Sequence, residues 1–87
     1  MKEFMYKIKD EVGIHARPAG MLVKEAEKYK SEIMLKNTAN EKVAAAKKLF
    51  AVMGLAVKCG DEVCVSADGE DEDAALSGMK AFFEDNL

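Results

Sequence analysis

The strongest constraint on the fold is the order in which two hydrophobic periodicities alternate along the chain. Apolar residues at every second position are typical of strands with one buried face, and a recurrence every three or four residues is typical of helices. The strand-like segments are 4–8, 32–36, 42–45 and 62–67, and the helical segments are 16–29, 47–57 and 71–85. The predicted order is therefore βαββαβα.

Most of these segments have one apolar side to bury. An antiparallel sheet with all three helices on one face buries those sides with the fewest layers. We therefore predict an α+β fold, an open-faced β-sandwich in which a four-stranded antiparallel sheet carries three helices on one face. The least secure strand is 42–45, because its alanines are also compatible with a helix.

The other face of this sheet is expected to be open to solvent. If the alternation holds, Met5, Met34, Cys64 and Ser66 point towards that open face. Scattered apolar side chains on a solvated sheet need no functional explanation. The alternative is a weak contact surface for another protein, and the sequence leaves both interpretations open.

The length of the chain limits where chemistry can take place. Its 87 residues fit a single domain, 1–87, with one modest core. That leaves little room for the cavity of about 300 Å³ or more that is typical of small-molecule sites. We therefore expect any chemistry to lie on the surface, with another protein as its substrate.

Charge and apolar-run length argue against two classes of partner. The formal net charge of -3 gives no basis for nucleic-acid binding. No apolar run approaches the ~18 residues of a membrane span, so we expect no membrane insertion. The first residues lack the features of a signal peptide, and Cys59 and Cys64 are expected to be free thiols in a reducing compartment. These features predict a cytoplasmic protein.

The run Gly13-Ile14-His15-Ala16-Arg17-Pro18-Ala19 carries the candidate chemistry. His15, the only histidine of the chain, falls where a loop enters a predicted helix. The free amides of Ala16 and Arg17 and the helix dipole favour an anion there, and the Arg17 guanidinium can bind phosphate oxygens bidentately. A neutral imidazole is a nucleophile near pH 7. These residues alone leave two interpretations open, a phosphoryl acceptor and a solvated histidine at a helix cap.

The same run resembles the active-site signature of the HPr family, the histidine-containing phosphocarriers of the bacterial sugar phosphotransferase system. The resemblance extends over essentially the whole chain, including 47–57 and 66–72. It implies an HPr-like open-faced sandwich and a carrier rather than an enzyme. It also implies that enzyme I phosphorylates His15, that Arg17 stabilises the phosphate, and that IIA proteins receive the group. No metal or other cofactor is implied.

The resemblance further implies a docking surface on the first two helical segments. An apolar patch ringed by lysines there suits partners with an acidic rim. Because a carrier must dock and leave, we expect a monomer. The residues implied in docking are Ala16, Arg17, Gly20, Met21, Lys24, Glu27, Lys47, Lys48, Leu49, Phe50 and Met53.

One departure from the family concerns a regulatory serine that many members from Gram-positive bacteria carry before an apolar pair. Here Lys48 holds that position, and Thr38 is the only hydroxyl residue between Ser31 and Ser66. We therefore predict no regulatory phosphorylation at this site. Lys48 either extends the basic rim or is tolerated because it is exposed.

Two alternatives to the transport role stay open: a paralogue in a regulatory or nonsugar phosphorelay, and a noncatalytic binding module of the same fold.

Overall fold

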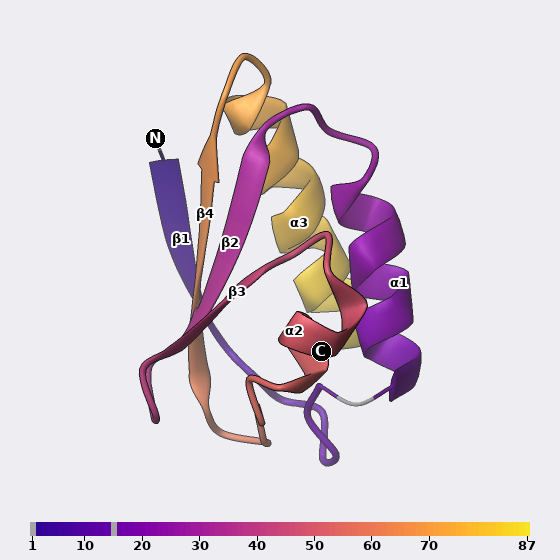
Figure 1. Cartoon of the computed structure of the whole chain (residues 1–87). Helices are drawn as coiled ribbons and strands as arrows, with labels where there is room; N and C mark the ends of the chain where they lie inside the picture. The colour runs from indigo at the N-terminus through magenta and orange to yellow at the C-terminus, as the bar shows by residue number, and fades with distance from the viewer. Residues whose placement is uncertain (1, 15) are drawn as a thin grey trace.

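The computed structural model describes residues 2–14 and 16–87 and confirms the predicted order of elements (Figure 1). Figure 1 shows the sheet on one side and the three helices together on the other. The elements are β1 (Lys2–Lys7), α1 (Ala16–Ala26), β2 (Glu32–Asn37), β3 (Lys42–Ala45), α2 (Leu49–Met53), β4 (Glu62–Asp68) and α3 (Glu72–Asn86).

The four strands form one antiparallel sheet in the order β1-β4-β2-β3. One inward-facing row runs across all four strands, from Phe4 to Val65, Leu35 and Ala44. The least secure strand, 42–45, pairs with β2 over its whole length. The open-faced sandwich predicted from the hydrophobic patterns is therefore confirmed.

The core fills the space between the sheet and the helices, and Phe83 of α3 is the largest fully buried side chain among the described residues. Its ring meets those of Phe4 and Tyr6 edge-on, with centroids 6.1 and 5.5 Å apart. The other large, fully buried apolar side chains come from the loops, from all three helices and from the inner strands β2 and β4: Ile8, Leu22, Ile33, Leu35, Val52, Leu55, Val63, Val65 and Met79. This packing fixes α3 across β1 and β4.

Two helices are shorter than their apolar patterns predict. α1 ends at Ala26 instead of 29, because the amide of Tyr29 bonds to the carbonyl of Ala26 in a tight turn, at 3.2 Å. α2 occupies only Leu49–Met53 of the predicted 47–57, and Ala56 adopts a left-handed φ of 54° soon after it. Across the described residues, no helix combines the length and apolar character needed to cross a membrane.

The predicted open face is present and is a mixed surface. Met5 lies opposite Cys64 and Met34 opposite Ser66, whereas Val63 and Val65 face the core. The Cys64 thiol lies 3.3 Å from Oε2 of Glu3, and partial burial together with this carboxylate raises the pKa of the thiol. Both cysteines are free. Among the described residues of this face, polar groups such as Ser66 and Glu3 therefore lie between the methionines.

Asp71 links the start of α3 to the turn between α1 and β2. Its carboxylate accepts hydrogen bonds from the backbone amides of Lys30 and Ser31, each at 2.8 Å, and from the hydroxyl of Ser31. These bonds favour the ionised carboxylate, and the Ser31 hydroxyl contributes most. They lower the pKa of Asp71 to about 2. One of the acidic residues at the start of α3, Asp71, therefore has a structural role.

This low pKa predicts a loss of stability in acid. Because the folded-state pKa of Asp71 is about 2 and lies below the unfolded-state value, the carboxylate stabilises the fold above about pH 4, and this contribution falls as pH drops towards 2. We expect Asp71→Asn to be less stable than the wild type at pH 6 and to show a flatter decline between pH 5 and pH 2. Urea denaturation across that range tests this.

Asp85→Asn is the matched control, since Asp85 is an exposed carboxylate at the other end of α3. Its pH profile should follow that of the wild type. Equal slopes for Asp71→Asn and the wild type below pH 5 would contradict a stabilising role for the ionised Asp71.

Candidate functional site

The predicted phosphoryl acceptor, His15, lies outside the described residues, but both flanking segments are described. Before it, Gly13 and Ile14 are buried against the loop between α2 and β4. The amide of Ile14 donates to the carbonyl of Val57 at 3.1 Å. Gly13 has a φ of 77°, and a Cβ there would lie 2.3 Å from the same carbonyl oxygen. The chain therefore reaches His15 from a tightly fixed position.

After His15, α1 begins at Ala16, the predicted first residue. Pro18 and Ala19 are buried and anchor the first turn, whereas Ala16 and Arg17 are exposed. The amides of a first helical turn have no acceptor within the helix, so those of Ala16 and Arg17 lie at the positive end of the dipole. Within residues 2–14 and 16–87, the Arg17 guanidinium has no ion-pair partner. It is therefore available to an anion bound at the helix start.

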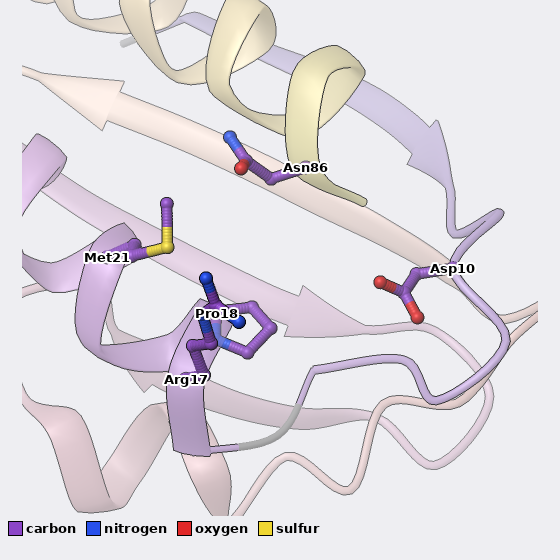
Figure 2. A pocket seen from close by; sticks show the side chains of 5 residues that line it. All are labelled: Asp10, Arg17, Pro18, Met21 and Asn86. Carbon is purple, nitrogen blue, oxygen red and sulfur yellow. The ribbon is translucent and has the colours of Figure 1, made fainter.

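Beside this helix start is a hollow that the sequence patterns did not reveal. It has a volume of about 230 Å³, and its lining comes from α1, from the loop after β1 and from the last turn of α3 (Figure 2). The lining residues are Asp10, Arg17, Pro18, Met21 and Asn86. Its volume lies below the roughly 300 Å³ of ordinary small-molecule pockets, as the chain length led us to expect.

Hydrogen bonds hold the walls of this hollow in place. The amides of Lys9 and Asp10 both donate to the backbone carbonyl oxygen of Leu87, at 2.6 and 2.8 Å. The side-chain amide of Asn86 donates to the carbonyl of Phe82 at 3.0 Å. No local motif connects Asp10 with Asn86, because the chain after β1 and the end of α3 meet through long-range contacts such as these hydrogen bonds to Leu87. This explains why sequence reasoning missed both residues.

The predicted docking residues lie mainly on the solvent side of α1 and α2, which pack beside each other (Figure 1). Four large apolar side chains are exposed there, and Phe50 stands out at 83% exposure. We call these four residues the apolar patch: Met21, Leu49, Phe50 and Met53. Lys24, Glu27 and Lys48 are also exposed, and Gly20 is half-buried.

The two adjacent lysines of the predicted rim have different environments. The ammonium of Lys47 donates to the carbonyl of Tyr29 at 2.7 Å, so it joins the start of α2 to the turn after α1. Lys48 is exposed and occupies the N-cap of α2, where its side chain makes no capping hydrogen bond. Of the two charges, that of Lys48 is therefore the more accessible to a partner.

Two asparagines that the sequence analysis did not single out hold the chain that follows α2. The side-chain amides of Asn37 and Asn40 both donate to the carbonyl of Leu55, each at 3.0 Å. Asn37 is fully buried, and its side-chain oxygen also accepts the amide of Ala39 at 3.0 Å. These bonds attach the chain after α2 to the β2–β3 turn.

Known proteins resemble this chain in both sequence and fold. Residues 2–85 match the family model described as "PTS HPr component phosphorylation site". A phosphocarrier protein HPr from Mycoplasma capricolum is 45% identical over 80 residues, which cover 92% of this chain and 88% of the relative. A solved histidine-containing phosphocarrier protein from Mycoplasma superposes with a TM-score of 0.91 at 42% identity, over 97% of this chain and 93% of that one.

An HPr from Thermoanaerobacter tengcongensis, solved as a dimer, is also similar. Its TM-score is 0.75 at 36% identity, over 98% of this chain and 95% of that one. The matched range, residues 2–85, includes both His15 and Arg17. The chain therefore belongs to the HPr family, the phosphocarriers of the phosphotransferase system.

Proposed function

We propose that this protein accepts a phosphoryl group on His15 from phosphorylated enzyme I and transfers it to IIA proteins. The observation that carries the proposal is the exposed Arg17 guanidinium, which has no ion-pair partner among the described residues, at the first turn of α1. In the loading step the bond from phosphorus to the donor atom of enzyme I breaks, the donor keeps the electron pair, and a bond from phosphorus to an imidazole nitrogen of His15 forms. Onward transfer reverses these roles.

The site is suited to holding the phosphoryl group for a limited time. Arg17 offers paired N–H donors, and the amides of Ala16 and Arg17 add the positive end of the helix dipole. Because these residues are exposed, water screens their charges, so stabilisation of the phosphorylated state stays moderate. Moderate stabilisation keeps transfer to the next protein favourable.

The proposed partner surface combines the apolar patch with the charges around it. Lys24 and Lys48 complement an acidic rim on enzyme I or a IIA protein, and Phe50 is the natural anchor because it is large and 83% exposed. The remaining residues of the proposed interface are Ala16, Arg17, Gly20, Glu27 and Lys47. The ammonium of Lys47 already bonds to Tyr29, so we expect it to contribute less than Lys48.

We further infer that residues 1–87 act as one cytoplasmic domain and that the working form is a monomer. A single hydrophobic core supports one domain. The dimeric Thermoanaerobacter relative makes the oligomeric state worth measuring. Sedimentation equilibrium at micromolar concentration should give the mass of one chain, and a dimer mass would overturn the monomer.

A role in a regulatory or nonsugar phosphorelay is the second candidate, and Lys48 is the observation that favours it. Lys48 occupies the N-cap of α2, the position at which a regulatory serine is expected from the family resemblance. We expect the kinase that modifies this serine in homologues to leave the protein unmodified. A serine-containing homologue serves as the positive control, and label on any residue from 42 to 54 would refute the prediction.

The proposed function is tested by coupled transfer. Phosphoenolpyruvate, enzyme I and a panel of IIA proteins are incubated with and without this protein, and phosphate on each IIA protein is measured. We expect transfer to at least one IIA protein only when the carrier is present. Phosphorylation of the carrier without transfer to any sugar-specific IIA protein would favour the specialised phosphorelay. A binding module would accept no phosphate at all.

A further inference from the structure

Asp10 is a carboxylate that the surrounding backbone holds in place. Its Oδ1 accepts the amide of Val12 at 2.9 Å, and its backbone carbonyl accepts the amide of Gly13 at 3.1 Å. Its own amide donates to the carbonyl of Leu87 at 2.8 Å, which ties the loop after β1 to the end of α3. The half-buried side chain is therefore fixed at the edge of the hollow that it lines.

Arg17 lines the same hollow from the first turn of α1, with Asp10 on the loop that faces it (Figure 2). The two side chains carry opposite charges, yet neither forms an ion pair with any residue of the described part of the chain. The exposed guanidinium is at the end of a long flexible side chain, whereas the carboxylate is held by Val12. Attraction across the hollow therefore acts mainly on the orientation of Arg17.

The loop does not require the negative charge of Asp10. Asparagine has the same shape, and its side-chain oxygen would accept the amide of Val12 equally well. A negative charge is also unfavourable beside a site proposed to hold a phosphoryl group, because like charges repel. The local structure thus explains a hydrogen-bond acceptor at position 10 but leaves its charge without a structural reason.

We propose that Asp10 is a positioning residue whose carboxylate competes with the phosphoryl group for the Arg17 guanidinium. The inference rests on the proposed function and deepens it. In the unphosphorylated protein, the carboxylate draws the guanidinium towards the hollow. When His15 is phosphorylated, the guanidinium turns to the phosphoryl oxygens and loses this attraction. The phosphorylated state is then stabilised less than Arg17 alone would allow, so transfer to the next protein stays favourable.

The test measures the equilibrium in which phosphorylated enzyme I and the carrier become enzyme I and phosphorylated carrier. The phosphoryl group passes from the donor atom of enzyme I to an imidazole nitrogen of His15, and no other reactant takes part. Labelled phosphorylated enzyme I, freed from phosphoenolpyruvate, is mixed with carrier, and the acid-labile label on each protein is counted. Because the equilibrium constant compares only the free proteins, a change that affects docking alone does not move it.

Asp10→Asn should shift this equilibrium about threefold towards the phosphorylated carrier, in line with the modest strength of an exposed charge pair. The melting temperature should stay within about 2 °C of the wild type, since the acceptor for the Val12 amide is kept. Glu11→Gln is the matched control, because it removes the same charge from an exposed neighbour that does not line the hollow. Its equilibrium constant should equal that of the wild type.

An Arg17→Ala background shows whether Asp10 acts through Arg17. In that background, Asp10→Asn should change the equilibrium constant by less than about 1.5-fold, because there is no guanidinium to compete for. An equal shift in both backgrounds would mean that the carboxylate repels the phosphoryl group directly, and would overturn the competition.

The other outcomes are also distinct. Equal constants for Asp10→Asn and a phosphorylated wild type overturn this inference and leave the proposed function intact. An equal shift for Glu11→Gln overturns the inference as well, because the effect would then come from net charge. Failure of the wild type to accept phosphate, while a known HPr does, overturns the proposed function and this inference together. A shift that is confined to Asp10→Asn and lost with Arg17→Ala supports the competition.

Discussion

Gly13→Ala is expected to be the most destabilising single-methyl change near the site. At a φ of 77°, the new Cβ would lie 2.3 Å from the carbonyl oxygen of Val57 and 2.7 Å from the Cα of Lys58. Both are backbone atoms, so no side-chain rotation can relieve the clash. The left-handed conformation alone costs about 1–2 kcal/mol for alanine. We therefore expect a total loss of at least about 2 kcal/mol, seen as a fall in melting temperature of roughly 10 °C.

Gly60→Ala separates the two causes of this loss. Gly60 has a φ of 91°, but a Cβ there would meet no atom within 4 Å, so this variant isolates the conformational cost. It should lose only about 1 kcal/mol. Because Gly13 lies two residues before His15, we also expect Gly13→Ala to reduce the rate of phosphorylation. Equal stability losses for the two variants would show that the Val57 clash relaxes at no cost.

Arg17→Ala is expected to produce the largest loss of phosphoryl transfer among residues other than His15. Removing the guanidinium deletes a paired donor at the point where charge accumulates, which should lower kcat on the order of 100-fold. Because Arg17 is exposed and has no described ion-pair partner, its replacement should leave the melting temperature nearly unchanged. Single-turnover transfer from phosphorylated enzyme I measures the effect.

Arg17→Lys distinguishes geometry from charge. Lysine keeps the positive charge but loses the planar fork that binds two phosphate oxygens. We expect its kcat to lie between those of the wild type and Arg17→Ala. A rate for Arg17→Ala within threefold of the wild type would contradict the proposed role. Equal rates for lysine and arginine would show that charge alone matters.

The element order could be predicted because each strand and each long helix has one apolar side. The alternation in 62–67 and the stripe in 71–85 correspond closely to β4 and α3. The ends of α1 and α2 could not be predicted from apolar spacing, because they depend on individual backbone bonds. The tight turn from Tyr29 to Ala26 and the left-handed Ala56 are examples.

The site was only partly predictable from the sequence. The spacing of His15 and Arg17 at a helix start indicated an anion site, and the resemblance to the HPr family gave it a function. The positions of Asp10 and Asn86 beside Arg17 depend on long-range packing of β1 and α3. The bond from Lys47 to Tyr29 likewise depends on how the start of α2 packs against the turn after α1. Long-range contacts of this kind cannot be predicted from the spacing of apolar residues in the sequence.

The central proposal, a phosphoryl group carried on His15, is tested most directly by labelling with enzyme I and radioactive phosphoenolpyruvate. Wild type and His15→Ala are compared, with a known HPr as positive control. The wild type should take up one acid-labile phosphate per chain, and His15→Ala should take up none. Equal labelling of both proteins, or no labelling of the wild type while the control is labelled, would contradict the proposal.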